Sequence, residues 1–130
     1  MWLWGISGEE YDRHADLWPL NPEGDLLAIL MIESVEGLQN LDAIASTPGV
    51  GALFVGAASD MTRSMGVRPG SPEVEVGLQK VLGACKTHKV SCAITATNGN
   101  DIARRVREGW NIIRSTVPAI NQGRALLGEK

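Results

Sequence analysis

Short apolar runs alternate with amphipathic helical stripes along this sequence, and the alternation limits the folds that the chain can adopt. The clearest run, residues 26–32, is continuous and apolar, whereas a strand with one face in water would alternate between apolar and polar residues. We therefore expect a strand that is covered on both faces. Further strands are expected over 52–55, 91–94 and 111–114. Strands separated by helices are typical of βαβ units and a parallel sheet.

Helices are expected between and beside these strands. Ser7 opens a capping-box pattern, so a first helix should begin there and run to about Leu17. A helix with an apolar stripe is expected over 38–45. Ser71 followed by Pro72 is a strong helix start, because serine caps helices and proline is favoured at the first helical position. The other expected elements are a loop over 56–70, a helix over 100–108 and a last helix over 117–127.

Two architectures fit this order of elements: an open doubly wound sheet, and part of a closed (β/α)8 barrel. A complete barrel needs about 250 residues. Four βα units in 130 residues are about half of that, and periodicity alone leaves both architectures open. The chain contains no linker or low-complexity segment. We therefore expect residues 1–130 to form a single domain.

Composition and charge exclude several classes of protein. The formal net charge is -3 and the basic residues are scattered, so nucleic acid is not an expected partner. The longest apolar run is too short to span a membrane, and the N-terminus lacks the features of a signal peptide. We expect a cytoplasmic protein. Cys85 and Cys92 are expected to be reduced thiols in or near the core, since no other Cys or His pair completes a zinc pattern.

Candidate functional residues stand where the expected strands end, because ligands bind at the carboxyl ends of strands in both architectures. Glu33 directly follows the apolar run 26–32, and a lone carboxylate there is costly unless it is paired or binds a cation. Asp60 lies at the equivalent rim of the neighbouring strand. Two carboxylates on adjacent strand ends can converge on one divalent cation, and their oxygen atoms suit Mg²⁺ or Mn²⁺ better than zinc.

A structural interpretation of the same residues stays open at this point. Glu33 could cap the next helix or pair with an arginine, and Asp60 could be a turn residue. His14 and His88 lie in expected helices, and no histidine stands close enough in sequence to suggest a Ser-His triad. Further polar residues follow the last two expected strands; they are Thr95, Thr97, Asn98, Arg114, Ser115 and Thr116.

Five segments together resemble a known family; they are 31–36, 40–45, 48–56, 59–61 and 64–66. They are similar to the HpcH/HpaI aldolase–citrate lyase family, and the similarity is sharpest from about Leu26 to Gly70. The resemblance implies an α/β fold, namely the C-terminal portion of a (β/α)8 TIM barrel of the phosphoenolpyruvate/pyruvate superfamily type. About four βα units of such a barrel are expected here.

The resemblance also implies a site and a reaction. Glu33 and Asp60 match the family's metal-binding Glu and Asp, which hold Mg²⁺ or Mn²⁺, with Co²⁺ as a third candidate. The metal binds the carboxylate and keto oxygens of a pyruvate-like unit and stabilises the enolate. Backbone N–H groups of Ser59 and Asp60 would help to hold the substrate carboxylate. The implied reaction is retro-aldol cleavage of a 2-oxo acid substrate, either a 4-hydroxy-2-oxo acid or a 2-dehydro-3-deoxy sugar acid, to pyruvate and an aldehyde.

The sequence departs from the family pattern at several points. Met31 stands where Gln is frequent, the loop over 56–60 is one residue longer than the commonest form, and residues 114–116 replace a Gly-Ser-Asp. Family members are about twice as long as this chain. Their catalytic His and the Arg that grips pyruvate lie in the N-terminal half, so we expect neither here. The alternative expectation is a catalytically incomplete half barrel that serves assembly or binding. Its open sheet edges predict that it dimerises, pairs with its missing half or aggregates, and of these we expect a homo-oligomer.

Overall fold

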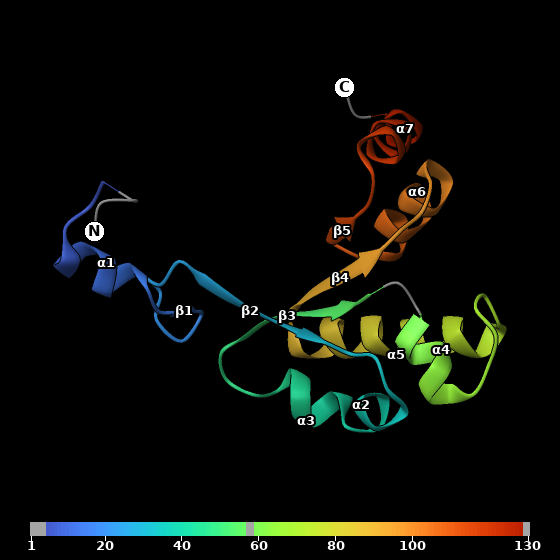
Figure 1. The fold of residues 1–130 in the computed structure, drawn as a ribbon, viewed down its shortest axis with the longest axis horizontal. Helices are drawn as coiled ribbons and strands as arrows, with labels where there is room; N and C mark the ends of the chain where they lie inside the picture. The colour runs from blue at the N-terminus through green and yellow to red at the C-terminus, as the bar shows by residue number, and fades with distance from the viewer. Residues whose placement is uncertain (1–4, 57–58, 129–130) are drawn as a thin grey trace.

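The computed structural model describes residues 5–56 and 59–128, which are arranged around one parallel sheet (Figure 1). The strands are β1 (Leu17–Trp18), β2 (Leu26–Met31), β3 (Val50–Val55), β4 (Ser91–Thr95) and β5 (Ile112–Arg114). The helices are α1 (Gly8–His14), α2 (Val35–Gln39), α3 (Leu41–Ala45), α4 (Ser59–Met65), α5 (Pro72–His88), α6 (Gly99–Glu108) and α7 (Val117–Leu127).

The order of the strands distinguishes between the two architectures. The five strands lie side by side in the order β1-β2-β3-β4-β5, and every neighbouring pair is parallel. A doubly wound sheet reverses its strand order at a switch point, whereas the strands of a (β/α)8 barrel follow the order of the chain. The sheet therefore has barrel topology.

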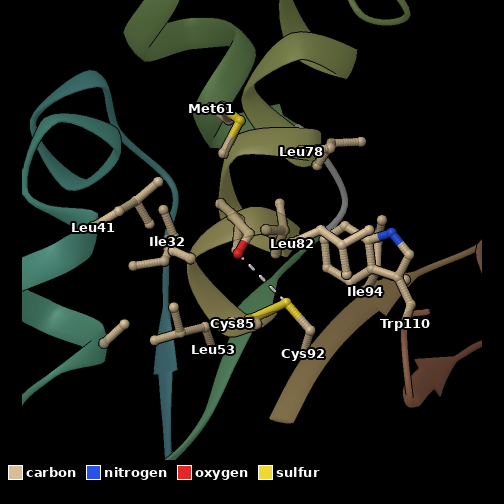
Figure 2. Close-up of a cluster of buried hydrophobic side chains, with 14 of the residues drawn as sticks. Ile32, Leu41, Leu53, Met61, Leu78, Leu82, Cys85, Cys92, Ile94 and Trp110 are labelled. Atoms are coloured by element: carbon tan, nitrogen blue, oxygen red, sulfur yellow. Dashed lines mark hydrogen bonds between the residues drawn. A yellow bond between two sulfur atoms is a disulfide. The ribbon is translucent and has the colours of Figure 1, made fainter. Parts of the chain in front are cut away.

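Helices α2, α3, α4 and α5 lie on one side of β2 and β3, while α6 and α7 pack together beside β4 and β5 (Figure 1). The main core lies between α5 and the sheet and includes Leu53, Val81 and Trp110, which are all fully buried (Figure 2). The helix α5 is the longest of the described helices, yet neither it nor any other described helix is long and apolar enough to cross a membrane.

Several boundaries differ from those expected. The expected loop over 56–70 contains helix α4, because Met61 and Thr62 are buried there and the Thr62 hydroxyl donates to the Ser59 carbonyl at 2.7 Å. The expected helix over 38–45 is divided at Asn40 into α2 and α3. The first helix ends at His14 instead of about Leu17, which lies in β1.

The expectation that β2 is covered on both faces is wrong. The run does form a strand, but its side chains are largely exposed; the exposed fraction is 49% for Ile29 and 54% for Met31. The reason is visible in Figure 1: no helix of the described chain covers the face of β2 away from α2 and α3, and its outer neighbour β1 has only two residues. Only Ile32, just past the strand, enters the core.

The expectation of two free thiols is also wrong, because Cys85 and Cys92 form a disulfide (Figure 2). Cys85 lies in the last turn of α5 and Cys92 lies in β4. Lys89 adopts the left-handed conformation at the end of α5 (φ 57°) and turns the chain back toward the sheet. The two Cα atoms are consequently 5.8 Å apart, within the range that a disulfide spans.

A buried ion-pair network joins α5 to α6. The side chain of Arg105 is only 5% exposed, and its guanidinium donates to both carboxylate oxygens of Glu75 at 2.7 and 2.8 Å. It also donates to Glu108 at 3.0 Å. The hydrogen bonds from Arg105 lower the pKa of Glu75 to about 2. A buried guanidinium with these partners holds the two helices in a defined relative position.

Candidate functional site

The sheet has one face that packs against α5 and an opposite face, called here the open face. Leu53 is buried in the core against α5, so its neighbour Phe54 lies on the open face, since successive strand residues point to opposite faces. Met31 is the strand partner of Phe54 and shares that face. Two residues beyond Met31, the same alternation places Glu33 on the open face at the carboxyl end of β2.

The same argument applies to the other side of the sheet. Ile94 belongs to the core, and its strand partner Ile113 packs against the same core, so the next residue, Arg114, lies on the open face at the end of β5. The register therefore places Glu33 and Arg114 on one face and at one edge of the sheet.

A pocket of about 240 Å³ opens at this edge. Its polar lining consists of Glu33, Ser59, Asp60 and Arg114. The remaining lining is largely apolar and comprises Met31, Ile32, Phe54, Val55, Gly56 and Met61. The structure thus brings the three residues named from the sequence, Glu33, Ser59 and Asp60, to one pocket and adds an arginine to them.

Glu33 neither caps the helix that follows it nor pairs with an arginine of the described chain, the two structural roles that its position allowed. Ser34 caps α2 instead, because its hydroxyl oxygen accepts a hydrogen bond from the Gly37 N–H at 3.0 Å. Within residues 5–56 and 59–128, none of the ion pairs involves the Glu33 carboxylate. The side chain is exposed at the rim of the pocket, where it is accessible to a cation.

Asp60 lies in the first turn of α4, and its side chain is 55% exposed. It forms an ion pair with Arg63 on the same helix, with 3.4 Å between Oδ1 and Nη1. Exposed pairs of this kind contribute at most about 1 kcal/mol, so this pair does not prevent the carboxylate from binding a divalent ion.

A hydrogen bond joins the two segments that carry these carboxylates, although the segments are far apart in the sequence. The Val35 N–H donates to the Ser64 hydroxyl at 2.9 Å. Val35 begins α2, directly after Glu33 and Ser34, while Ser64 lies in α4 one turn after Asp60. The bond therefore links the segment that carries one acidic residue to the helix that carries the other.

Arg114 is the residue of this pocket to which the sequence pattern assigned no role. The Ala96 N–H donates to the Arg114 carbonyl at 3.0 Å, and the Ser115 hydroxyl donates to the Ala96 carbonyl at 2.7 Å. These bonds fix the backbone at the end of β5. The side chain is exposed, and its guanidinium takes part in none of the hydrogen bonds and ion pairs of the described chain.

Other polar residues noted at strand ends do not enter this pocket. Thr95 and Thr97 line a different cavity of about 570 Å³ between α5 and α6, which also contains the Arg105 network. Asn98 caps α6, since its side-chain oxygen accepts from the Asp101 N–H at 3.0 Å. The two histidines also lie elsewhere: His14 is paired with Asp25, and His88 with Asp42.

The donor set suits a hard divalent cation. Among the described residues there is no group of three or more His, Cys, Asp or Glu side chains that could hold a metal ion. Zinc sites commonly need at least three protein ligands. Mg²⁺ typically binds one or two carboxylates and completes its shell with water and substrate oxygens. Glu33 and Asp60 on the rim of one pocket fit that second pattern.

Comparison with known proteins identifies the family. The sequence pattern of the HpcH/HpaI aldolase/citrate lyase family matches residues 13–118. The chain belongs to this family. Its membership confirms the resemblance seen in segments such as 31–36, and it agrees with the chain-ordered parallel sheet.

Relatives of known name and structure support this assignment. The chain is 35% identical to hydroxypyruvate/pyruvate aldolase of Pseudomonas aeruginosa over 78% of its length and 35% of that protein's. It is 31% identical to 5-keto-4-deoxy-D-glucarate aldolase of Citrobacter koseri, and the match covers 84% of this chain and 45% of that protein. A crystal structure of an HpcH/HpaI family protein from Burkholderia cenocepacia superposes with a TM-score of 0.67 at 29% identity, covering 89% of this chain and 46% of that one.

The chain spans less than half the length of these relatives. The expected α/β fold, a portion of a TIM barrel, is confirmed by the parallel sheet and by the likeness to the solved family member.

Proposed function

We propose that this chain supplies part of the active site of a carbon–carbon lyase. The substrate is a 4-hydroxy-2-oxo acid or a 2-dehydro-3-deoxy sugar acid, which a retro-aldol reaction cleaves to pyruvate and an aldehyde. The observation that carries the proposal is the single pocket lined by Glu33, Ser59 and Asp60 at the carboxyl ends of adjacent parallel strands. The aldolase names of the relatives support this class of reaction.

The side chains of the pocket have distinct roles in this proposal. Glu33 and Asp60 hold a divalent ion, Mg²⁺ or Mn²⁺, with Co²⁺ as a third candidate. When bound, such an ion supplies Lewis-acid stabilisation of the negative charge that develops on the keto oxygen of the substrate. The backbone N–H groups of Ser59 and Asp60 donate to the substrate carboxylate. The apolar wall formed by residues such as Phe54 limits the access of water to the reacting atoms.

Metal binding tests the proposal directly on the 130-residue chain. Replacement of one carboxylate ligand, as in Glu33→Gln or Asp60→Asn, should weaken Mn²⁺ binding at least about tenfold, as measured by calorimetry or electron paramagnetic resonance. Glu36→Gln is the matched control, because Glu36 is an exposed glutamate on α2 that does not line the pocket. Equal Mn²⁺ affinity of the wild type and both pocket variants would refute the proposed metal site.

Activity forms a separate test. Apart from Glu33 and Asp60, which are assigned to the metal, none of the described residues that line the pocket is a His, Lys, Asp, Glu or Tyr that could act as a general base. We therefore expect no retro-aldol turnover from the 130-residue chain alone. In a longer form with the length of the relatives, Glu33→Ala should abolish metal-dependent cleavage. A rate close to that of the wild type would mean that Glu33 is only structural.

A second candidate function, an assembly or binding module without activity of its own, is favoured by one observation. The large apolar side chains of β2, among them Ile29 and Met31, are exposed on a strand next to the two-residue β1. Apolar surface of this kind marks an interaction site or a liability for aggregation. In this proposal the chain self-associates through β2, which gives a homo-oligomer.

A further inference from the structure

The charges of the candidate pocket are unevenly distributed. Glu33 and Asp60 belong to the β2 and β3 side, whereas Arg114 belongs to β5 and is the one cationic residue among the described residues that line the pocket. No ion pair joins Arg114 to either carboxylate within residues 5–56 and 59–128. Its guanidinium therefore does not serve to neutralise them, and it remains available for another anion.

We propose that Arg114 binds a second carboxylate of the substrate, at the end of the molecule that does not contact the metal. Arg114 is then the residue that selects 2-oxo acids with two carboxylates over those with one. The inference rests on the proposed metal site, because it assigns the opposite end of the same pocket. Guanidinium groups suit this role, since two of their N–H groups can donate in parallel to one carboxylate.

The separation of the strands supports the assignment to the far end. Adjacent strands lie about 4.8 Å apart, so the ends of β3 and β5 are separated by about 10 Å, with β4 between them. A cation held by Glu33 and Asp60 would lie at the β2 and β3 end. A positive guanidinium and a divalent cation repel one another, and this repulsion favours positions at opposite ends of the pocket.

The test compares two ligands of equal length that differ in one group. 2-Oxoglutarate has a carboxylate where 2-oxovalerate has a methyl group, and neither can undergo retro-aldol cleavage. Their dissociation constants are measured by calorimetry on the 130-residue chain in saturating Mg²⁺. The wild type should bind 2-oxoglutarate at least about tenfold more tightly than 2-oxovalerate, since hydrogen bonds between charged groups are strong enough for that difference.

Arg114→Gln should reduce this preference to within about twofold while leaving the affinity for 2-oxovalerate unchanged, and Arg114→Lys should restore part of it. Arg107→Gln is the charge-matched control, because Arg107 lies on α6 and donates to the Leu126 carbonyl away from the pocket. It should keep the full preference. Persistence of the preference in Arg114→Gln, or its absence in the wild type, would overturn the assignment of Arg114.

The two proposals fail in different ways. If binding of 2-oxovalerate depends on Mg²⁺ and is lost in Glu33→Gln, the metal site is supported whatever Arg114 does. If binding of both ligands is independent of Mg²⁺ and of Glu33, the proposed function fails first. The Mg²⁺ affinity of Arg114→Gln adds a readout without substrate. If Arg114→Gln bound Mg²⁺ more than about tenfold more tightly than the wild type, the guanidinium would have to pair with the acidic residues, and the proposal would be wrong.

Discussion

The hydroxyl of Ser64 accepts a 2.9 Å hydrogen bond from the backbone N–H of Val35, although the two residues are 29 positions apart in the sequence. Through this bond, the segment that follows β2 is held against helix α4. Glu33 lies on the first of these elements and Asp60 on the second. The bond therefore joins the two elements that carry the proposed metal ligands, although Ser64 itself does not line the pocket.

Removal of this hydroxyl should loosen the site without unfolding the protein. In Ser64→Ala the Val35 N–H loses its partner at an exposed position, where water can replace the hydroxyl, so the free energy of unfolding should fall by only about 1 kcal/mol. Mn²⁺ affinity should fall severalfold, because the two segments that carry the carboxylates are no longer joined by this bond. Calorimetry and urea unfolding measure the two effects.

Ser46→Ala is a suitable control for Ser64→Ala. The Ser46 hydroxyl is also exposed and donates only to the Ala43 carbonyl at the end of α3, away from the pocket. Its loss should leave Mn²⁺ affinity unchanged. If Ser64→Ala also bound Mn²⁺ as tightly as the wild type, the Val35–Ser64 bond would have no part in positioning the carboxylates.

The positions of the longer strands could be predicted because each is a continuous apolar run between turn residues. The exposure of β2 could not be predicted from the sequence. An apolar run indicates that a strand can be buried, but it does not show which helix or strand would cover it. Helix α4 was missed because small and polar residues dominate the segment 56–70, and its buried positions, Met61 and Thr62, are too few to form a recognisable stripe.

The acidic residues of the candidate site could be named from the sequence because the carboxyl ends of parallel strands meet at one edge of a sheet. Arg114 could not be assigned to the pocket in the same way. Its inclusion depends on the pairing of Ile94 with Ile113, which directs Ile113 to the core and leaves Arg114 on the open face. A shift of one residue in that register would have turned the guanidinium toward the core side.

The ion pair between Glu75 and Arg105 should make stability depend on pH below about pH 5. Hydrogen bonds from Arg105 lower the pKa of Glu75 from its ordinary value of 4.5 to about 2. Because the folded-state pKa is the lower one, the pair stabilises the fold fully above the unfolded-state value, and this contribution is lost as the pH falls from about 4.5 toward 2. Urea unfolding between pH 6 and pH 2.5 measures this loss in the free energy of unfolding.

Glu75→Gln should remove this part of the pH dependence. At pH 6 the variant should be less stable by about 1–2 kcal/mol, because Arg105 keeps its bond to Glu108 but loses the two bonds to the carboxylate. The difference between the variant and the wild type should shrink toward pH 2.5, and Glu36→Gln should show no such convergence. A constant difference across this range would show that the charge of Glu75 does not contribute to stability.

The disulfide between Cys85 and Cys92 predicts a defined thiol content. A thiol reagent should detect no free thiol in the denatured, unreduced protein and two after reduction. Because the bridge closes a short loop, its loss should lower the free energy of unfolding by about 2–3 kcal/mol. Cys85→Ala/Cys92→Ala and the reduced wild type should be similarly destabilised. Two reactive thiols before reduction would instead support the thiol state expected from the composition.

The exposed apolar side chains of β2 should cause the chain to self-associate. Ile29 lies on the open face and is 49% exposed, so Ile29→Lys places a charge in this surface without altering the backbone pairing of β2. Sedimentation velocity at increasing protein concentration should show weaker association of this variant than of the wild type. Val117→Lys is the control, since Val117 is 70% exposed but lies at the start of α7. Equal association of all three proteins would mean that the contact lies elsewhere than β2.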